Sequence, residues 1–347
     1  MSYLDKKVHA EGVCASYLQN FPCRSILWAE GDIDNKVIGE DRNMERLSEN
    51  KIKRTLFVYN PKAGKGTVVK NLHEIVDAFT KVNYPVTVYP TQAQGDACRL
   101  VETRDAGQYD LIVCSGGDGT LREVVNGLMK SGVATPVGYI PAGSTNDFAR
   151  SLGLPDDIPE AMEIITKGKP FLCDAGNFNG ENFVYVAAFG LFTDVSYATN
   201  QQWKNIFGHV AYILEGVKSL SSIQSYEVQI ECDEGTMRGN YIYGMVTNSL
   251  SVGGFKNITG KDVSFDDGKF EVILIRRPAT FAELNDIVIS LLRQSFDAIC
   301  MQSFKTSYLK IKSREEINWT LDGEFGGTYI DVEIKNVQRA FPIMVRK

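Results

Sequence analysis

The sequence has few histidines and no closely spaced cysteines. Its 347 residues include three histidines, none near another, and no Cys-x-x-Cys pair. The cysteines are odd in number and scattered: Cys14, Cys23, Cys98, Cys114, Cys173, Cys232 and Cys300. Because zinc sites and disulfide frameworks need clustered or evenly paired ligands, we expect reduced thiols in a cytoplasmic protein.

Long apolar segments and a basic excess are also lacking. No apolar run approaches the ~18 residues that favour a membrane-spanning helix, and the N-terminus has no apolar core of a secretory signal. The formal net charge is −6, without the basic footprint that nucleic-acid binding requires. Apolar residues make up 44% and charged residues 23%. We therefore expect a soluble globular protein with room for two domains and no nucleic-acid partner.

A glycine-rich segment, Cys-Ser-Gly-Gly-Asp-Gly-Thr at 114–120, follows the apolar stretch 110–113 and precedes a helical pattern. A strand that ends in glycines before a helix places free backbone N–H groups where they bind phosphate. Asp118 and Thr120 add a carboxylate and a hydroxyl, which suggests a nucleotide site that also binds a metal ion. The alternative is an ordinary tight turn, for which glycine is common.

Two further segments have the same plan of strand, polar loop and helix. They are 136–150, with a Pro-Ala-Gly turn before Ser144, Thr145, Asn146 and Asp147, and 54–67, with Asn-Pro-Lys-Ala-Gly-Lys-Gly-Thr after a strand. Loops that follow parallel strands meet at one edge of the sheet, where ligands of open α/β folds bind. Three such units make chance turns the weaker explanation.

The hydrophobic patterns predict two kinds of structure. Residues 54 to about 168 alternate between strands and helices, which indicates an α/β domain with a parallel sheet covered by helices. Its strands are expected near 55–59, 86–90, 110–114 and 136–140, and its helices near 67–82, 95–106, 119–131, 144–151 and 159–167.

From 170 onward the pattern predicts a second, mainly antiparallel domain, interpreted as a β-sandwich. Strands are expected at 182–190, 225–232, 238–247, 269–275, 306–312 and 329–334, with helices at 203–221 and 280–296. The predicted domain bounds are 1–50, an extension without an assigned function, 51–168, 169–327, and 328–347 as returning strands. Met44 is an alternative start.

Five motifs in the same order resemble the soluble diacylglycerol kinase family of lipid kinases, related to sphingosine and ceramide kinases. They are Asn60–Gly66, Gly116–Thr120, Pro141–Arg150, Phe265–Phe270 and Leu321–Gly327, and they are most similar to the bacterial members. The resemblance implies a nucleotide-binding α/β domain, a β-rich lipid-binding domain, a nucleotide site in the cleft between them, and final strands that return to the first domain.

ATP and Mg²⁺ are the implied co-substrate and metal. Residues 60–67 do not fit a Walker A motif, and from the residues alone a structural turn is as good an explanation. The resemblance implies these ATP-binding residues: Asn60, Pro61, Lys62, Ala63, Gly64, Thr91, Gly116, Gly117, Asp118, Gly119, Thr120, Leu121, Arg122 and Thr145. Thr91 lies in the least distinctive of these stretches.

Two cation sites are predicted. Asp118 and Asp147 follow neighbouring strands and suit Mg²⁺, which takes few protein oxygens and bridges phosphates. The alternative for Asp147 is a helix cap, although Asn146 or Ser144 could supply it. The resemblance implies a second, structural cation at the Asp267 side chain and the carbonyls of Ser264 and Lys269. An Asp-Gly turn is the alternative there.

The segment Leu-Asp-Gly-Glu-Phe-Gly-Gly at 321–327 has the Asp-Gly signal of a hairpin turn. The resemblance implies that Asp322 is the general base that accepts the proton of the lipid hydroxyl while the γ-phosphate transfers in line. Glu324 is expected to assist, and Asp118 is the alternative base.

The sequence thus predicts an ATP- and Mg²⁺-dependent lipid kinase whose leading substrate is diacylglycerol, with phosphatidic acid as the product. The alternatives are a phosphatidylglycerol or sphingoid hydroxyl as acceptor, an NAD kinase, which shares Gly-Gly-Asp-Gly-Thr, and a non-catalytic lipid- or nucleotide-binding regulator. A cytoplasmic lipid kinase without a transmembrane segment must meet its substrate by transient peripheral docking at the inner membrane surface. A homodimer is left open.

Overall fold

The computed structural model describes residues 52–103, 106–191, 216–217, 219–252, 255–256, 263–293, 295 and 297–347. All of these belong to one compact unit, residues 50–347. The predicted extension 1–50 and most of the predicted helix 203–221 lie outside the described residues.

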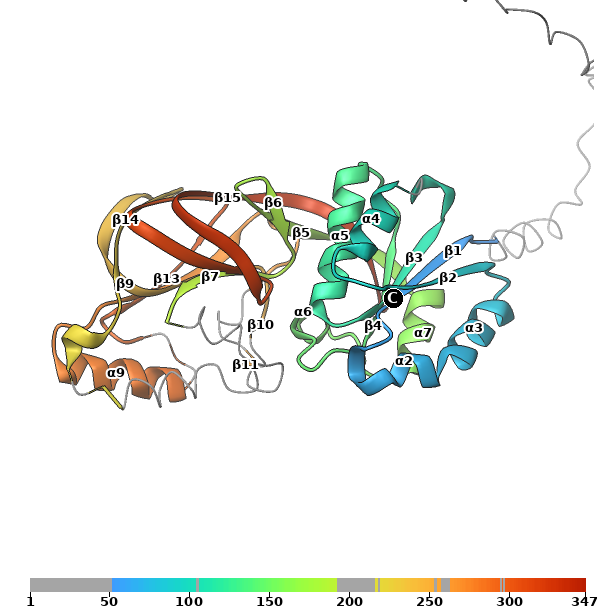
Figure 1. The fold of residues 1–347 in the computed structure, drawn as a ribbon, viewed down its shortest axis with the longest axis horizontal. Coiled ribbons are helices and arrows are strands. Elements are labelled where there is room, and N and C mark those ends of the chain that lie inside the picture. The colour runs from blue at the N-terminus through green and yellow to red at the C-terminus, as the bar shows by residue number, and fades with distance from the viewer. Residues whose placement is uncertain are drawn as a thin grey trace, which may run out of the picture. The chain divides into compact units, whose positions relative to one another are not determined.

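The α/β part begins with four parallel strands in the order β4-β3-β1-β2 (Figure 1). They are β1 (Thr55–Tyr59), β2 (Val86–Pro90), β3 (Leu111–Gly116) and β4 (Val137–Pro141). Every residue of β1, β3 and β4 is buried, as expected for parallel strands covered on both faces. The predicted parallel sheet is therefore present.

Helices cover both faces of this sheet. Alternate residues of β1 point to opposite sides, so Leu56 packs with α4 and α5, whereas Phe57 packs with α3 and α7. The helical elements are η1 (Ala63–Gly66), α2 (Thr67–Lys70), α3 (Leu72–Lys81), α4 (Asp96–Thr103), η2 (Ala106–Gln108), α5 (Asp118–Ser131), α6 (Asp147–Ser151) and α7 (Ile158–Lys167). The single helix predicted over 67–82 is interrupted at Asn71, which separates α2 from α3.

The β-rich part is mainly antiparallel. Its strands are β5 (Lys169–Phe178), β6 (Glu181–Phe183), β7 (Val186–Gly190), β8 (Tyr226–Cys232), β9 (Gly235–Thr247), β10 (Ser251–Val252), β11 (Phe255–Lys256), β12 (Phe270–Arg276), β13 (Met301–Thr306), β14 (Tyr308–Leu321) and β15 (Glu324–Val345). Two helical elements accompany them, η5 (Leu220–Ser222) and α9 (Phe281–Leu292). The sequence prediction missed β5 and β13, as well as the two-residue strands β10 and β11.

The two long strands β9 and β14 close the β-rich part around its own core. Each pairs with β7 at one end and with β8 at the other. Trp319 fills the interior, with its ring centroid 5.0 Å from that of Phe178 and 4.8 Å from that of Phe189. The predicted sandwich is thus formed by one hydrogen-bonded sheet that wraps around its core, rather than by two separate sheets.

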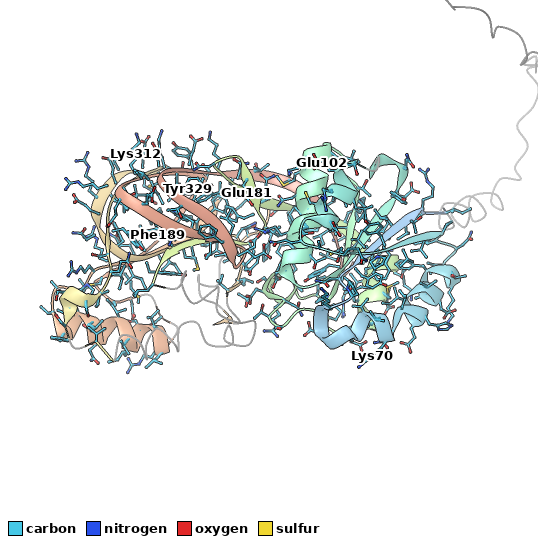
Figure 2. The ribbon with its side chains drawn as sticks, viewed as in Figure 1. Lys70, Glu102, Glu181, Phe189, Lys312 and Tyr329 are labelled. Carbon is cyan, nitrogen blue, oxygen red and sulfur yellow. The ribbon has the colours of Figure 1, made fainter. Side chains whose placement is uncertain are left out.

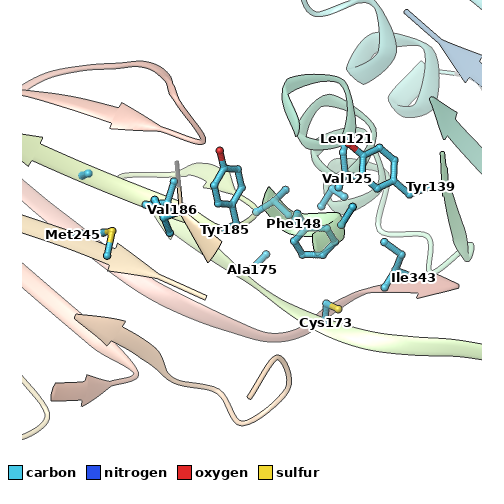
Figure 3. Close-up of a cluster of buried hydrophobic side chains, with 14 of the residues drawn as sticks. Leu121, Val125, Tyr139, Phe148, Cys173, Ala175, Tyr185, Val186, Met245 and Ile343 are labelled. Carbon is cyan, nitrogen blue, oxygen red and sulfur yellow. The ribbon is translucent and has the colours of Figure 1, made fainter. Parts of the chain in front are cut away.

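β5 and β15 run from the β-rich part into the α/β part. The last residues of β15 pair with the start of β5, and Ile343 pairs with Val137 of β4. The core under α4 and α5 continues along this junction: Figure 3 shows Leu121 and Phe148 on one side and Tyr185 and Met245 on the other, with Ala175 between them. The shared core fixes the β14–β15 turn relative to the loops of the parallel sheet.

Charged side chains such as Lys70, Glu102 and Lys312 point outward (Figure 2). Among the helices of the described residues, none is long and apolar enough to cross a membrane.

Candidate active site

A cavity of about 820 Å³ lies between the loops of the parallel sheet and the β14–β15 turn. Loops after β1, β2, β3 and β4 all contribute to its lining, as does the segment before β7. The lining residues are Asn60, Lys62, Ala63, Gly64, Thr91, Gln92, Ala93, Gln94, Gly117, Asp118, Gly119, Thr120, Glu123, Gly143, Ser144, Thr145, Tyr185, Asp322, Gly323 and Glu324.

The loop after β1 is closely fitted to its neighbours. The amide of Asn60 donates to the Ser115 carbonyl at 2.9 Å, and its side-chain oxygen accepts from the Lys62 amide at 2.9 Å. Gly64 has a φ of +56°, and a Cβ there would lie 2.7 Å from the Ala142 carbonyl oxygen. Only glycine meets both conditions without strain, so this loop can lie against the loop after β4.

The loop after β3 leads into helix α5 at Asp118. The amides of Thr120 and Leu121 both donate to the Gly117 carbonyl. The amides of Asp118 and Gly119, in contrast, have no hydrogen-bond partner within the described part of the chain. N–H groups at a helix N-terminus with no partner are well suited to bind an anion. The amides of Asp118 and Gly119 are therefore a surface of the cavity that is suited to bind phosphate.

The Asp118 carboxylate lies between two helix N-termini. It accepts hydrogen bonds from the Asp147 and Phe148 amides at 3.2 and 3.3 Å and from the Thr145 hydroxyl at 3.4 Å. It thus caps helix α6, a role for which the sequence suggested Asp147, Asn146 or Ser144. Asn146 instead accepts from the Gly143 amide at 2.8 Å.

Burial, followed by the negative charge of Asp147, raises the pKa of Asp118 to about 7. Asp147 is itself buried, and its carboxylate accepts a hydrogen bond of 2.7 Å from the Ser251 hydroxyl. Asp147 is not among the lining residues. Asp118 therefore faces the cavity, with Asp147 behind it.

Asp322 lies at the β14–β15 turn with a φ of +49°, followed by Gly323 with a φ of +82°. Positive φ at both central residues is typical of a two-residue type I′ hairpin. The Asp322 carboxylate accepts from the amides of Val184, Tyr185 and Val186 at 2.7, 2.9 and 3.1 Å. Burial raises its pKa, whereas Arg122 and these amides oppose the increase.

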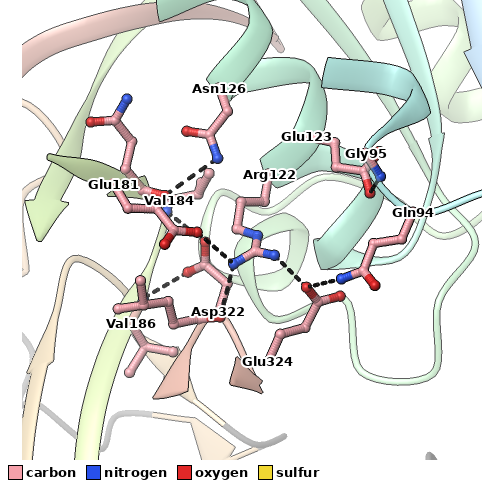
Figure 4. Close-up of polar contacts among 12 residues, drawn as sticks. Gln94, Gly95, Arg122, Glu123, Asn126, Glu181, Val184, Val186, Asp322 and Glu324 are labelled. Atoms are coloured by element: carbon pink, nitrogen blue, oxygen red, sulfur yellow. Dashed lines mark hydrogen bonds and ion pairs between the residues drawn. The ribbon is translucent and has the colours of Figure 1, made fainter. Parts of the chain in front are cut away.

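Glu324, the first residue of β15, contacts the α/β part. It forms an ion pair with Arg122, and it accepts a hydrogen bond of 3.0 Å from the Gln94 side chain. Figure 4 shows both contacts. Glu324 lines the cavity, and both partners contact the Oε2 atom of its carboxylate.

The structure brings most of the predicted ATP-binding residues together around the cavity. Pro61, Gly116, Leu121 and Arg122 do not line it. Ser264, Asp267 and Lys269 lie elsewhere, on the loop before β12. There the Asp267 carboxylate accepts from the Lys269 amide at 3.0 Å, as an Asp-Gly turn would. The second cation remains a prediction.

Sequence reasoning did not assign several lining residues: Gln92, Ala93, Gln94, Glu123, Gly143, Ser144, Tyr185 and Gly323. Glu123 holds the loop after β2, because its carboxylate accepts from the amides of Gly95 and Ala97 at 2.7 and 3.1 Å. The position of Gln92–Gln94 directly after a predicted strand was the available signal. For Tyr185 the only signal was its place in an apolar segment.

A helix N-terminus with unpaired amides at the edge of a parallel sheet, facing a buried carboxylate on a hairpin, is an arrangement suited to phosphoryl transfer. Residues 54–178 match the model of the diacylglycerol kinase catalytic domain. The chain is 33% identical to a diacylglycerol kinase of Bacillus subtilis strain 168 over 298 residues, covering 85% of this chain and 97% of that protein. A diacylglycerol kinase of Staphylococcus epidermidis is 34% identical over 276 residues, 79% of this chain and 87% of that one.

Solved structures agree with these comparisons. The crystal structure of a diacylglycerol kinase from Bacillus anthracis strain Sterne is 26% identical, with a TM-score of 0.67, and covers 85% of this chain and 98% of that one. A second structure from that organism is also 26% identical, with a TM-score of 0.74, and covers 85% of this chain and 98% of that one. The chain is therefore a lipid kinase by class. It belongs to the diacylglycerol kinase family.

Proposed function

We propose that this chain transfers the γ-phosphate of ATP to the free hydroxyl of diacylglycerol in a magnesium-dependent reaction. The observation that supports this best is a single cavity that brings together the free amides of Asp118 and Gly119, the Asp118 carboxylate and the Asp322 carboxylate. An anion-binding surface, a candidate metal ligand and a candidate base are the groups that phosphoryl transfer to an alcohol requires.

The loops after β1, β3 and β4 are the proposed ATP site. Gly117 and Gly143 approach so closely that a Cβ on Gly143 would lie 2.6 Å from the Gly117 Cα. Their backbones can therefore approach a phosphate chain without side chains in the way. We assign the phosphates to the amides of Gly117–Gly119 and the rest of the nucleotide to the loops of Asn60–Gly64 and Thr91.

The acidic groups next to this surface fit a magnesium ion. Asp118 is buried beside Asp147, whose negative charge opposes the ionisation of Asp118, so a bound divalent cation would offset a repulsion already present in the protein. Asp118 would hold the ion directly, with Asp147 behind it. Bound magnesium supplies charge neutralisation for the transferring phosphoryl group.

Asp322 is the proposed general base. Two of its three amide bonds go to Oδ1 and one to Oδ2, so Oδ2 retains acceptor capacity for the proton of an acceptor hydroxyl. The amides fix the orientation of the carboxylate without neutralising it. Asp118 is the alternative base, but its carboxylate is directed to the N-terminus of α6.

Diacylglycerol is the proposed acceptor because the Bacillus and Staphylococcus relatives are diacylglycerol kinases. A phosphatidylglycerol or sphingoid hydroxyl is the second choice. With no spanning helix among those that the structure describes, we propose a cytoplasmic protein that docks transiently at the inner membrane surface. The β-rich part, proposed as the 169–327 lipid-binding domain, would present the acceptor. We propose no oligomeric state.

The experiment is a transfer assay with γ-labelled ATP and Mg²⁺. Mixed micelles or vesicles would contain diacylglycerol, phosphatidylglycerol, sphingosine or ceramide, and NAD would be tested in parallel. We expect label in phosphatidic acid, with a rate that follows the surface concentration of diacylglycerol. Label in NAD alone would overturn the proposal in favour of an NAD kinase, and no transfer to any acceptor would favour a regulator.

A further inference from the structure

We propose that Arg122 is a positioning residue that holds the turn of Asp322 against helix α5, and that it does not bind the nucleotide. This inference rests on the proposed function, because it assumes that Asp322 is the general base that Arg122 positions. It differs from the expectation that Arg122 contacts ATP.

The Arg122 side chain is committed to the β14–β15 hairpin (Figure 4). It is 8% exposed. One guanidinium nitrogen pairs with Glu324, and the other donates to the Leu321 carbonyl at 3.3 Å. The same nitrogen lies 4.0 Å from a Glu181 carboxylate oxygen. Leu321 and Glu324 flank the Asp322–Gly323 turn, so a single planar guanidinium contacts both ends of it.

The phosphate-binding surface begins on the same helix. Asp118 is the first residue of α5, and Arg122 follows about one helical turn later, on the same face. A Cβ on Gly119 would lie 3.0 Å from a Glu324 carboxylate oxygen. Helix α5 therefore contacts the hairpin at two successive turns and links the position of Asp322 to that of the phosphate-binding amides.

The geometry argues against a nucleotide contact. Arg122 does not line the cavity, and the hydrogen bonds of its guanidinium go to the hairpin, to the Leu321 carbonyl and the Glu324 carboxylate. Its Nε has no partner among the described residues but is buried, so this donor is not open to the cavity. A phosphate would have to displace Glu324 to reach the guanidinium.

The charge of Arg122 also acts on Asp322. Arg122 opposes the rise that burial causes in the pKa of Asp322. The other charged groups around this carboxylate are Glu324 and Glu181, which pair with Arg122, and Asp118 across the cavity. A base must be ionised to act, so removing the Arg122 charge raises the pKa of Asp322 and moves the acidic limb of the pH–rate profile to higher pH.

The experiment compares Arg122→Met, Arg122→Lys and a control, Arg314→Met, in the full chain. Arg314 is a strongly exposed arginine of β14 that pairs with Glu227, so its variant tests loss of an arginine away from the turn. For each we would measure ATP affinity by calorimetry, kcat with diacylglycerol, and kcat as a function of pH at saturating Mg²⁺.

We expect Arg122→Met to lower kcat by ~10- to 100-fold, the effect of a catalytic group displaced by about 1 Å, with little change in ATP affinity. The acidic limb of its pH–rate profile should move to higher pH. Arg122→Lys, which retains the positive charge, should lower kcat but leave that limb at the wild-type pH. Arg314→Met should match the wild type. Loss of ATP affinity by about 10- to 100-fold, as for a broken charged hydrogen bond, would overturn the proposal, as would an Arg122→Met enzyme with unchanged kcat.

A binding-independent measurement separates this inference from the proposed function. The amides of Val184–Val186 donate hydrogen bonds to Asp322. Their hydrogen exchange should accelerate in Arg122→Met and not in Arg314→Met. This holds whether or not the wild type phosphorylates diacylglycerol. Unchanged exchange in Arg122→Met would contradict the positioning role. If that variant does not fold, Glu324→Gln, which weakens the ion pair with Arg122 and retains the side-chain size, should accelerate the same amide exchange to a smaller degree.

Discussion

Asp118 and Asp322 line the same cavity from opposite sides, but their surroundings differ. Asp118 faces the negative charge of Asp147 and accepts three weak contacts of 3.2–3.4 Å. The Asp322 carboxylate accepts hydrogen bonds from three amides, the shortest of 2.7 Å, and the positive charge of Arg122 lies nearby. The charges that act most strongly on Asp118 are negative, whereas the charge that acts most strongly on Asp322 is positive. On this difference we propose Asp118 as the metal ligand and Asp322 as the base.

The largest expected effect is that of Asp118→Ala. Because Asp118 would organise the magnesium ion and cap α6, turnover should fall by at least ~10³-fold, as when a major electrostatic contact to the transition state is lost. Circular dichroism and the melting temperature would show whether the fold is intact. A folded Asp118→Ala protein with near-normal kinase activity would contradict the assignment.

Asp322→Asn comes next, since asparagine keeps the size of the side chain and removes its basicity. Proton transfer to a positioned base contributes about 10²- to 10⁴-fold, so kcat should fall by that factor while ATP affinity changes little. Kinetics with diacylglycerol in mixed micelles would measure it. A loss restricted to ATP binding would indicate that Asp322 is only a structural residue of the turn, and the base would then be Asp118.

A smaller effect is expected for Glu123→Ala. This change removes the acceptor for the amides of Gly95 and Ala97 and loosens the loop after β2. Each charged hydrogen bond contributes about 1.5–3 kcal/mol, so ATP affinity and thermal stability should both fall. Glu102→Ala, on the exposed end of α4, is the matched control. Equal behaviour of the two variants would show that Glu123 does not hold the loop.

Tyr185→Phe is expected to have the smallest effect. Tyr185 lines the cavity, and burial followed by the charges of Asp118, Asp147 and Asp322 keeps the pKa of its phenol well above the usual value. It therefore remains a donor toward the cavity. One net hydrogen bond is worth about 0.5–1.5 kcal/mol, so kcat/KM should fall by about 2- to 10-fold. Tyr241→Phe, which removes a hydroxyl that is hydrogen-bonded to Gln302, is the control and should leave activity unchanged. Equal rates for Tyr185→Phe and Tyr241→Phe would exclude a hydrogen bond from Tyr185 to a substrate.

The sequence was sufficient for the elements whose pattern is local. The apolar runs at β1, β3 and β4 and the glycine-rich loops after them indicated a parallel sheet with a phosphate-binding edge. β5 was not predicted, because Lys169–Phe178 has no period-2 alternation: its exposed residues come first and its buried residues follow. Its partner is β15, far along the chain, and no local pattern encodes that pairing.

The roles of site side chains depend on contacts between distant segments. Helical spacing places Arg122 one turn after Asp118, but nothing local indicates that Leu321 and Glu324 lie beside it. For the same reason the cap of α6 was sought at Asn146 or Ser144, whereas Asp118, almost thirty residues earlier, supplies it. Sequence reasoning therefore identified the reactive residue types better than their partners.

The division of work between the two carboxylates is tested most directly by ATP binding with and without Mg²⁺. Calorimetry on the wild type, Asp118→Asn and Asp322→Asn requires no turnover, so it isolates the metal from the base. If the account is correct, Mg²⁺ strengthens ATP binding in the wild type and in Asp322→Asn, and this gain is lost in Asp118→Asn. A gain retained in Asp118→Asn and lost in Asp322→Asn would contradict it.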